Sequence, residues 1–142
     1  MKTLSNNSFN KLFTYAIICS MLFLYSCKDK EGVEPSMADQ VTGSYSVKSI
    51  SQGGLTVTLP VQGVSGEYTV KKVSDSQVAV SYVLKSAGYD DETGQEDATL
   101  KKGSDGSIEF YTSGKVGSFS NNTITFEFED TNGAIKIVAT KK

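Results

Sequence analysis

The stretch Thr123-Ile124-Thr125-Phe126-Glu127-Phe128-Glu129 alternates polar and apolar side chains at every position. In an extended chain, successive side chains point to opposite faces, so the apolar residues of this stretch share one face and the polar residues share the other. β-branched and aromatic residues are also the types enriched in strands. The stretch therefore predicts a β-strand with one buried face and one wet face.

The same two-residue period recurs along most of the chain after Val41, most clearly at residues 55–61 and 78–84. Turn-forming pairs such as Gly53-Gly54 and Asn121-Asn122 separate the periodic segments, and they suit tight hairpins because Gly and Asn accept positive φ. We expect eight or nine strands, near residues 42–51, 54–61, 66–73, 77–86, 98–102, 107–113, 115–120, 123–129 and 134–141.

These strands belong to a single all-β domain at residues 41–142. Short connections between strands that are neighbours in sequence imply antiparallel hairpins. A run of about eight amphipathic strands hides its edges best by closing on itself. A small antiparallel up-and-down barrel of eight or nine strands is therefore the leading architecture, and a two-sheet β-sandwich is the alternative. The domain shows no 3.6-residue period, so we expect helix only in the first 26 residues.

The amino-acid composition argues against several classes of function. The 142 residues include 14 Lys and 16 Asp or Glu, with no Arg, His or Trp. Without His there is no Ser-His-Asp triad and no His metal ligand, and without Arg there is no bidentate phosphate clamp. A formal net charge of −2 provides no electrostatic footprint for nucleic acid. We therefore expect no enzyme, no metal site, no cofactor and no nucleic-acid partner.

Residues 1–26 have the pattern of a secretory signal peptide that is removed from the mature chain. Lys2 and Lys11 precede an apolar run at residues 12–24. This run is shorter than the roughly 20 residues that a membrane-spanning helix needs. A basic start, a short apolar run and a small residue at the cleavage site are the features of such a peptide.

The end of the run, Leu24-Tyr25-Ser26-Cys27, resembles the lipobox of bacterial lipoproteins, with a less usual Tyr at the middle position between Leu24 and Ser26. The resemblance implies cleavage between Ser26 and Cys27, a diacylglycerol on the Cys27 thiol and an acyl chain such as palmitate on its amino group. The protein is then anchored in the cell envelope, in the outer membrane, and the membrane is its partner. Cys19 leaves with the signal peptide, so the mature chain forms no internal disulfide.

Residues 27–40 are expected to be the lipidated cysteine and a flexible polar tether. This segment is polar, contains a Pro and lacks any apolar period, and such chains behave as flexible linkers. The charged stretch Lys28-Asp29-Lys30-Glu31 is similar to the export signal of surface-exposed lipoproteins in the Bacteroidetes. The sequence leaves the surface and the periplasmic face open as alternatives.

Gly43-Ser44-Tyr45 opens the first expected strand, and about 100 residues of β-meander follow. This arrangement resembles the small lipocalin-like domains of Bacteroidetes lipoproteins. Lipocalins begin their barrel with Gly-x-Trp, and Tyr45 stands where that Trp would be. The family's Arg that packs over the ring has no counterpart, because the chain contains no Arg. The resemblance implies a barrel that binds a small apolar ligand.

The apolar face of the predicted strands forms either a filled core or a ligand cavity. Barrels of about eight strands have interiors that side chains can just fill, or that hold one small ligand. The short strands and large inward residues favour the filled core. If a ligand cavity exists, the candidates to line it are the large aromatic residues of the inward face, namely Tyr45, Tyr68, Tyr82, Phe110, Phe126 and Phe128.

Acidic residues gather in the longest expected connection, Ser86 to Asp97. Clustered oxygen ligands suit Ca²⁺, but the spacing departs from the EF-hand pattern. We therefore interpret the connection as a solvated loop. Glu109, Glu127 and Glu129 fall on the wet face, where cross-strand ion pairs with Lys48, Lys71 or Lys136 are the simplest role.

Two functional hypotheses follow from these patterns. In the first, a membrane-anchored lipocalin-like barrel binds a small apolar ligand. In the second, a non-catalytic structural lipoprotein contacts an envelope protein or a glycan through its loops or outer face. An interior cavity would favour the first hypothesis, and a contiguous exposed patch would favour the second.

Overall fold

The computed structural model describes residues 34–131 and 133–142. The segments in which the sequence predicts a signal peptide, a lipidation site at Cys27 and the first part of the tether lie outside these residues. The elements of the described chain, in order, are α2 (Met37–Val41), β1 (Gly43–Gln52), β2 (Leu55–Thr58), β3 (Ser65–Ser74), β4 (Gln77–Lys85), β5 (Glu92–Lys102), β6 (Ile108–Tyr111), β7 (Lys115–Ser120), β8 (Thr123–Asp130) and β9 (Gly133–Lys141). Each of the strands expected from the sequence is present.

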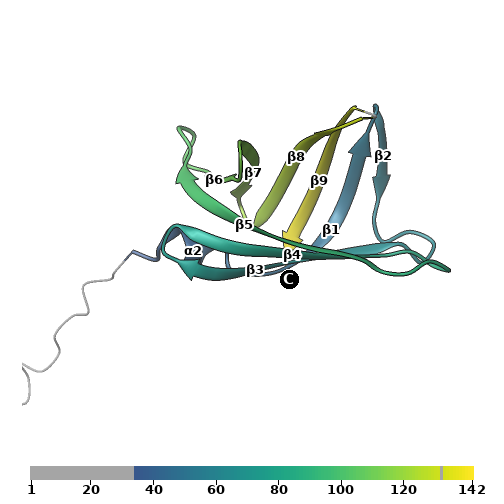
Figure 1. Cartoon of the computed structure of the whole chain (residues 1–142), viewed down its shortest axis with the longest axis horizontal. Helices are drawn as coiled ribbons and strands as arrows, with labels where there is room; N and C mark the ends of the chain where they lie inside the picture. Colours follow the sequence, from purple (N-terminus) through teal and green to yellow (C-terminus); the bar gives the residue numbers. More distant parts are fainter. Residues whose placement is uncertain (1–33, 132) are drawn as a thin grey trace, which may run out of the picture. The chain divides into compact units, whose positions relative to one another are not determined.

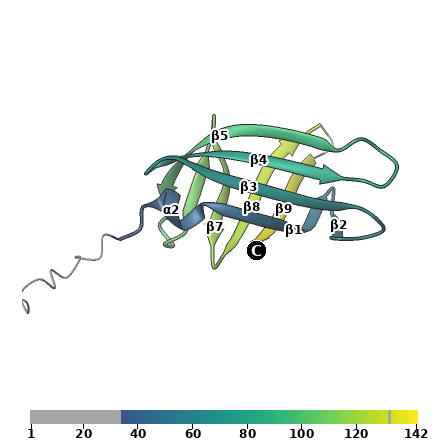
Figure 2. The same ribbon diagram turned by 90° about the horizontal axis from the view of Figure 1, so that it is seen from below.

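The strands form a closed antiparallel barrel (Figures 1 and 2). Neighbouring strands from β3 to β9 pair in sequence order, and β1 closes the barrel by pairing with both β9 and β3. Eight strands make the closed wall, and β2 is an additional strand paired with β1. The all-β barrel prediction is confirmed, and the sandwich alternative is wrong. Closure satisfies backbone groups that the edge strands of a sandwich would leave unpaired.

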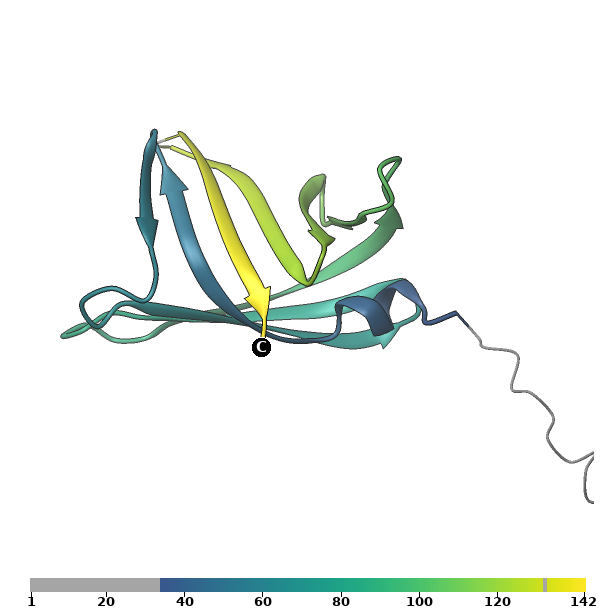
Figure 3. The same cartoon turned by 180° about the vertical axis from the view of Figure 1, so that it is seen from behind.

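Strand β1 pairs with two different strands along one of its edges. Residues Gly43 to Ser46 pair with β3, whereas Ser49 to Gln52 pair with β2. The other edge of β1 pairs with β9, with a register shift between Val47 and Ser49. Thus β2 replaces β3 as the neighbour of β1 at the end of the barrel farther from α2, as Figure 3 shows.

The tight turns have the backbone that the sequence predicts. Gly53 and Gly54 between β1 and β2 have φ of 58° and 83°. Asn121 and Asn122 between β7 and β8 have φ of 50° and 59°. Positive φ at both central residues matches the right-handed twist of the flanking strands, so each pair closes its hairpin in register.

The α2 end of the barrel is filled by side chains. Tyr45, Phe110 and Ile124 have no exposed surface there. The Tyr45 hydroxyl donates a hydrogen bond to the backbone carbonyl of Val41 at 2.5 Å, and its ring meets Phe119 edge-on at 6.4 Å between centroids. Lys141 Nζ lies 6.0 Å from the centroid of the Tyr45 ring, so a lysine packs over this ring in a chain without arginine. Burial raises the pKa of Tyr45 to about 12, which keeps its hydroxyl a neutral donor.

Helix α2 closes this end and corrects two predictions. Residues 37–40 were expected in the flexible tether, and helix was expected only in the signal peptide. Instead, Met37–Val41 form a five-residue helix that buries Ala38 and Val41 completely. The helix packs against β3 and β5. A helix this short has too few turns to show a 3.6-residue period, so hydrophobic patterning could not reveal it.

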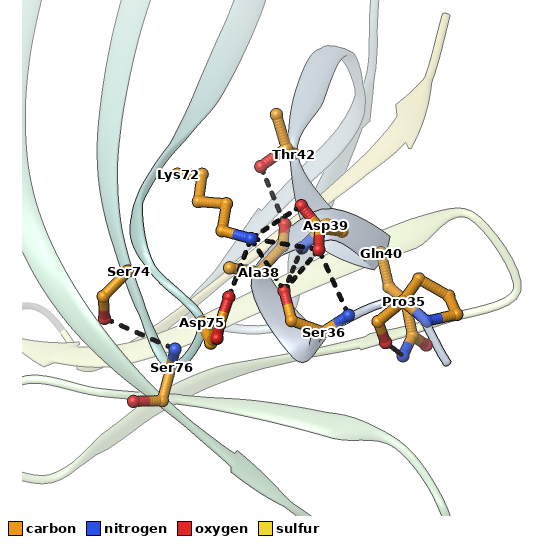
Figure 4. Close-up of polar contacts among 10 residues, drawn as sticks. All are labelled: Pro35, Ser36, Ala38, Asp39, Gln40, Thr42, Lys72, Ser74, Asp75 and Ser76. Atoms are coloured by element: carbon orange, nitrogen blue, oxygen red, sulfur yellow. Dashed lines mark hydrogen bonds and ion pairs between the residues drawn. The ribbon is translucent and has the colours of Figure 1, made fainter. Parts of the chain in front are cut away.

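Local hydrogen bonds hold α2 in place (Figure 4). The Ser36 side chain accepts a hydrogen bond from the Asp39 backbone N–H, and the Asp39 carboxylate accepts one from the Ser36 backbone N–H, which makes a capping box. Lys72 Nζ bridges Asp39 at 2.9 Å and Asp75 at 2.8 Å, tying α2 to the end of β3. The hydrogen bonds from Ser36 and Lys72 lower the pKa of Asp39, which stays charged at neutral pH.

Strand β5 also differs from its prediction. The sequence predicts a strand at 98–102 after an acidic loop, but β5 begins at Glu92, and the β4–β5 connection spans only residues 86–91. The first half of β5 carries few apolar residues because its inner face lines open space, as described below. Alternation of apolar and polar residues, which indicates a half-buried strand, is therefore absent from this half of β5.

The segment 35–142 contains all the strands of the barrel and the buried core of the described chain. It forms one compact unit. Every strand pairing of the closed wall lies within it, as does every buried apolar residue of the described chain, from Ala38 to Ala139. The isolated segment 35–142 is therefore a suitable material for measurements in solution.

The substitution Val41→Asp is expected to destabilise the segment 35–142 by about 2 kcal/mol, measured by urea unfolding. Val41 has no exposed surface, and a buried carboxylate without a partner is unfavourable. The short helix can undock to release the new charge, which limits the loss to the packing of α2. The matched control is Gln40→Asp on the exposed side of α2, with a loss below about 0.5 kcal/mol. Equal stabilities of the two variants would contradict the packing of α2 on the barrel.

Candidate functional site

A cavity of about 850 Å³ occupies the interior at the end of the barrel away from α2. Its lining reaches Gln52, Glu92 and Ile135, which lie beside the β1–β2, β4–β5 and β8–β9 connections. Apolar side chains make most of the wall: Ile50, Tyr68, Val80, Tyr82, Leu84, Ala98, Val116, Phe126, Phe128, Ile135 and Ile137. The barrel therefore has a filled end and a hollow end.

Strand alternation positions this wall. On β4, the side chains of Val80, Tyr82 and Leu84 are two residues apart and share the inner face, and Phe126 and Phe128 do the same on β8. The expectation of a filled core holds only for the α2 end. Towards the other end, the large side chains leave the centre of the barrel open.

Aromatic rings connect the filled core to the cavity. Phe110 meets Phe126 with ring centroids 5.5 Å apart, and Phe126 meets Tyr68 at 5.0 Å. Tyr68 in turn meets Tyr82 at 5.8 Å. These separations are typical of favourable aromatic pairs. The rings thus form a continuous series from the core into the cavity wall.

The structure separates the six aromatic residues that the sequence suggested for a cavity. Tyr68, Tyr82, Phe126 and Phe128 line it. Tyr45 and Phe110 do not, because they lie completely buried in the filled end. Alternation identifies which side chains point inward, but it carries no information on how far along the barrel axis the packing extends.

Sequence reasoning missed the polar part of the wall, which comprises Gln52, Glu92, Gln95, Glu96 and Thr112. Three of these residues belong to the half of β5 that was interpreted as a loop. The length of the preceding strand is the signal that could have found them: β4 runs from Gln77 to Lys85, and an antiparallel neighbour of matching length must extend back to Glu92.

Gly94 shapes the cavity wall between Glu92 and Glu96. A Cβ atom at Gly94 would lie 2.5 Å from Cε1 of Tyr82 and 2.8 Å from its hydroxyl. Tyr82 is the cross-strand partner of Gly94. Its ring therefore lies over β5 at the one position where the strand has no side chain, leaving space in the centre of the barrel.

Tyr68 presents a hydroxyl to the cavity. Its side chain lines the cavity although the residue is only 6% exposed. Burial, and after it the charges of Tyr82 and Glu92, raise the pKa of Tyr68 to about 12. No described residue accepts or donates a hydrogen bond at this hydroxyl, and no buried side-chain oxygen of the described chain is sealed away without a partner. The hydroxyl therefore faces the cavity space as a neutral group that can hydrogen-bond a ligand.

An apolar lip borders the open end. Leu55 and Val57 on β2 are 78% and 50% exposed. They pair with Gln52 and Ile50, which line the cavity, and residues directly opposite each other in a sheet share a face. Leu55 and Val57 therefore extend the inner face of the barrel beyond the enclosed space.

Two acidic residues of the outer wall, Glu109 and Glu127, form ion pairs with lysines on neighbouring strands. Glu127 forms a 2.8 Å ion pair with Lys136, which confirms that predicted cross-strand pair. Glu109 instead pairs with Lys115 at 2.5 Å and accepts a hydrogen bond from the Tyr111 hydroxyl. Lys115 is the main cause of a lowered pKa at Glu109, the opposite of what a catalytic acid requires.

The described residues contain neither a cluster of metal-binding side chains nor a helix suited to cross a membrane. Residues 34–131 and 133–142 contain no group of three or more Asp, Glu, His or Cys arranged to hold a metal ion. Within the same part of the chain, no helix has the length and apolar character needed to cross a membrane.

Comparison with known proteins does not place the chain in a family. No family model matches the sequence, and no curated protein matches it. Among solved structures, a redesigned β-barrel resembles it over 75% of this chain and 98% of its own, with 16% identity and a TM-score of 0.49.

Proposed function

We propose that the protein is a lipid-anchored component of the bacterial cell envelope whose lipocalin-like barrel binds a small apolar ligand. The single observation that carries the binding role is the 850 Å³ cavity at one end of the barrel. Its volume falls within the range of roughly 300–1,000 Å³ that small-molecule sites occupy. A wall of aliphatic and aromatic residues with a few polar groups is also typical of such sites.

The lipid anchor rests on the sequence of the first 27 residues. Cys27 in the lipobox-like stretch is the proposed acylation site, and the outer membrane is the proposed location. The described chain enters the barrel at α2, and the cavity opens at the other end of the same domain. The proposal includes no catalytic step and no nucleic-acid partner.

A residue that fills the cavity is expected to weaken ligand binding strongly. Ala98 lines the cavity on β5, so Ala98→Phe would place a ring in the open space. We expect binding of the neutral apolar dye N-phenyl-1-naphthylamine to the segment 35–142, followed by its fluorescence, to weaken about tenfold or more. The matched control is Thr99→Phe, which puts the same ring on the exposed face of the same strand and should bind dye as the parent does.

The two variants also distinguish the two functional hypotheses. Far-UV circular dichroism establishes that each variant remains folded. Failure of the parent segment to bind the dye would count against a ligand cavity. The exposed Leu55 and Val57 would then favour the alternative role, contact with an envelope protein through the apolar lip.

A further inference from the structure

The charge of the cavity wall is of one sign. Its charged residues are Glu92 and Glu96, and no lysine lines the cavity within the described chain. Since every cation of this protein is a lysine, the wall offers no positive side chain to an anionic ligand. A carboxylate or phosphate in the cavity would face two like charges without compensation.

Both carboxylates belong to the inner face of β5. Glu92, Gly94, Glu96 and Ala98 are spaced two residues apart, and all four line the cavity. Neither glutamate forms an ion pair with a lysine of the described chain, whereas Asp39, Glu109 and Glu127 each do. No lysine of the described chain therefore neutralises the two carboxylates of the cavity wall.

Tyr68 supplies a second, independent polar group at the same site. Its side chain lines the cavity although only 6% of the residue is exposed, and its hydroxyl is open to the cavity space rather than sealed away without a partner. The charge of Glu92 acts on this hydroxyl. The rings of Tyr68 and Tyr82, with centroids 5.8 Å apart, both line the cavity, and aromatic rings attract cations.

We propose that the ligand of this cavity is a protonated organic amine with an apolar body. The apolar part lies among Val80, Phe126 and Ile137, and the ammonium group lies beside Glu92 and Glu96, within reach of the Tyr68 hydroxyl oxygen as an acceptor. This inference rests on the proposed ligand-binding function and specifies the charge of the ligand.

Calorimetric titration with three matched probes tests the inference: decylammonium, decanoate and 1-decanol. The probes share a chain length and differ in charge, and each is added to the segment 35–142 at neutral pH and low salt. We expect decylammonium to bind about tenfold more tightly than 1-decanol and decanoate to bind most weakly. Added salt is expected to reduce the preference for the amine, because the two carboxylates are exposed to solvent.

Variants that remove a carboxylate charge test which residues cause the preference for decylammonium. The double variant Glu92→Gln and Glu96→Gln is expected to lose the preference, so that decylammonium and 1-decanol bind with similar affinity. The matched control is Asp97→Asn, which removes a carboxylate from the exposed outer face of β5 and should preserve the preference. Tyr68→Phe, which removes only the hydroxyl, is expected to weaken decylammonium binding about threefold.

The outcomes separate the two proposals. Equal affinities for the three probes, or tightest binding of decanoate, would overturn the amine assignment and leave a binding cavity in place. A preference that survives the double variant would also overturn it. Absence of measurable heat with all three probes would overturn the ligand-binding function itself.

Discussion

The substitution Phe110→Ala is expected to lower the free energy of unfolding of the segment 35–142 by about 3–5 kcal/mol. Phe110 has no exposed surface and packs against Phe126 in the filled end of the barrel. Truncation removes apolar contacts and leaves a void that neighbouring strands, fixed by closure of the barrel, cannot collapse to fill. The chain has no Trp, so urea unfolding is followed by far-UV circular dichroism.

The same truncation at the other end of the barrel provides the control. Phe128 lines the cavity and is 42% exposed, so Phe128→Ala enlarges a space that is already open. We expect a loss below about 1 kcal/mol. A loss at Phe128 as large as that at Phe110 would mean that both ends are packed alike. A loss below about 1 kcal/mol at Phe110 would contradict the filled end.

Most of the fold was predictable from the two-residue period and the turn residues. Alternation at 78–84 and 123–129 identifies β4 and β8, because a sheet with one face buried requires it. Gly53-Gly54 and Asn121-Asn122 identify two hairpins because few other residues adopt their positive φ. Closure follows from the need to satisfy the edges of an antiparallel series.

The first half of β5 and helix α2 were not predicted. Alternation of apolar and polar residues identifies a strand only where one face of that strand is buried. The first half of β5 faces a cavity, so Glu92, Gly94 and Glu96 occupy inner positions where a packed core would require apolar residues. Helix α2 is specified by a capping box and by contacts of Ala38 and Val41 with distant strands. Neither feature has a periodic signature in a segment of five residues.

Of the residues that line the cavity, the sequence predicted only the aromatic ones. Inward alternation selected Tyr68, Tyr82, Phe126 and Phe128, and all four line the cavity. It selected Tyr45 and Phe110 equally, because position along the barrel axis depends on strand stagger and not on local sequence. The acidic residues that give the cavity its charge were instead interpreted as a solvated loop.

Replacement of Cys27 by Ala is expected to abolish lipid attachment completely. In the proposed maturation, the diacylglycerol bonds to the cysteine Sγ, and Ala offers no nucleophile in its place. Each buried methylene contributes about 0.8 kcal/mol to membrane binding, so one acyl chain holds a protein marginally and two or more hold it stably. A protein without these acyl chains therefore has no lipid anchor.

Metabolic labelling of the full chain with an alkyne analogue of palmitate, together with the intact mass of the mature protein, measures this effect. The parent should carry label and begin at Cys27 with the added mass of its lipids. Cys19→Ala is the matched control, because it changes the other cysteine of the chain, within the segment that the proposed maturation removes. It should be labelled as the parent is. Label that persists in Cys27→Ala, or that disappears in Cys19→Ala, would place the acylation at Cys19 and would remove the basis for cleavage between Ser26 and Cys27.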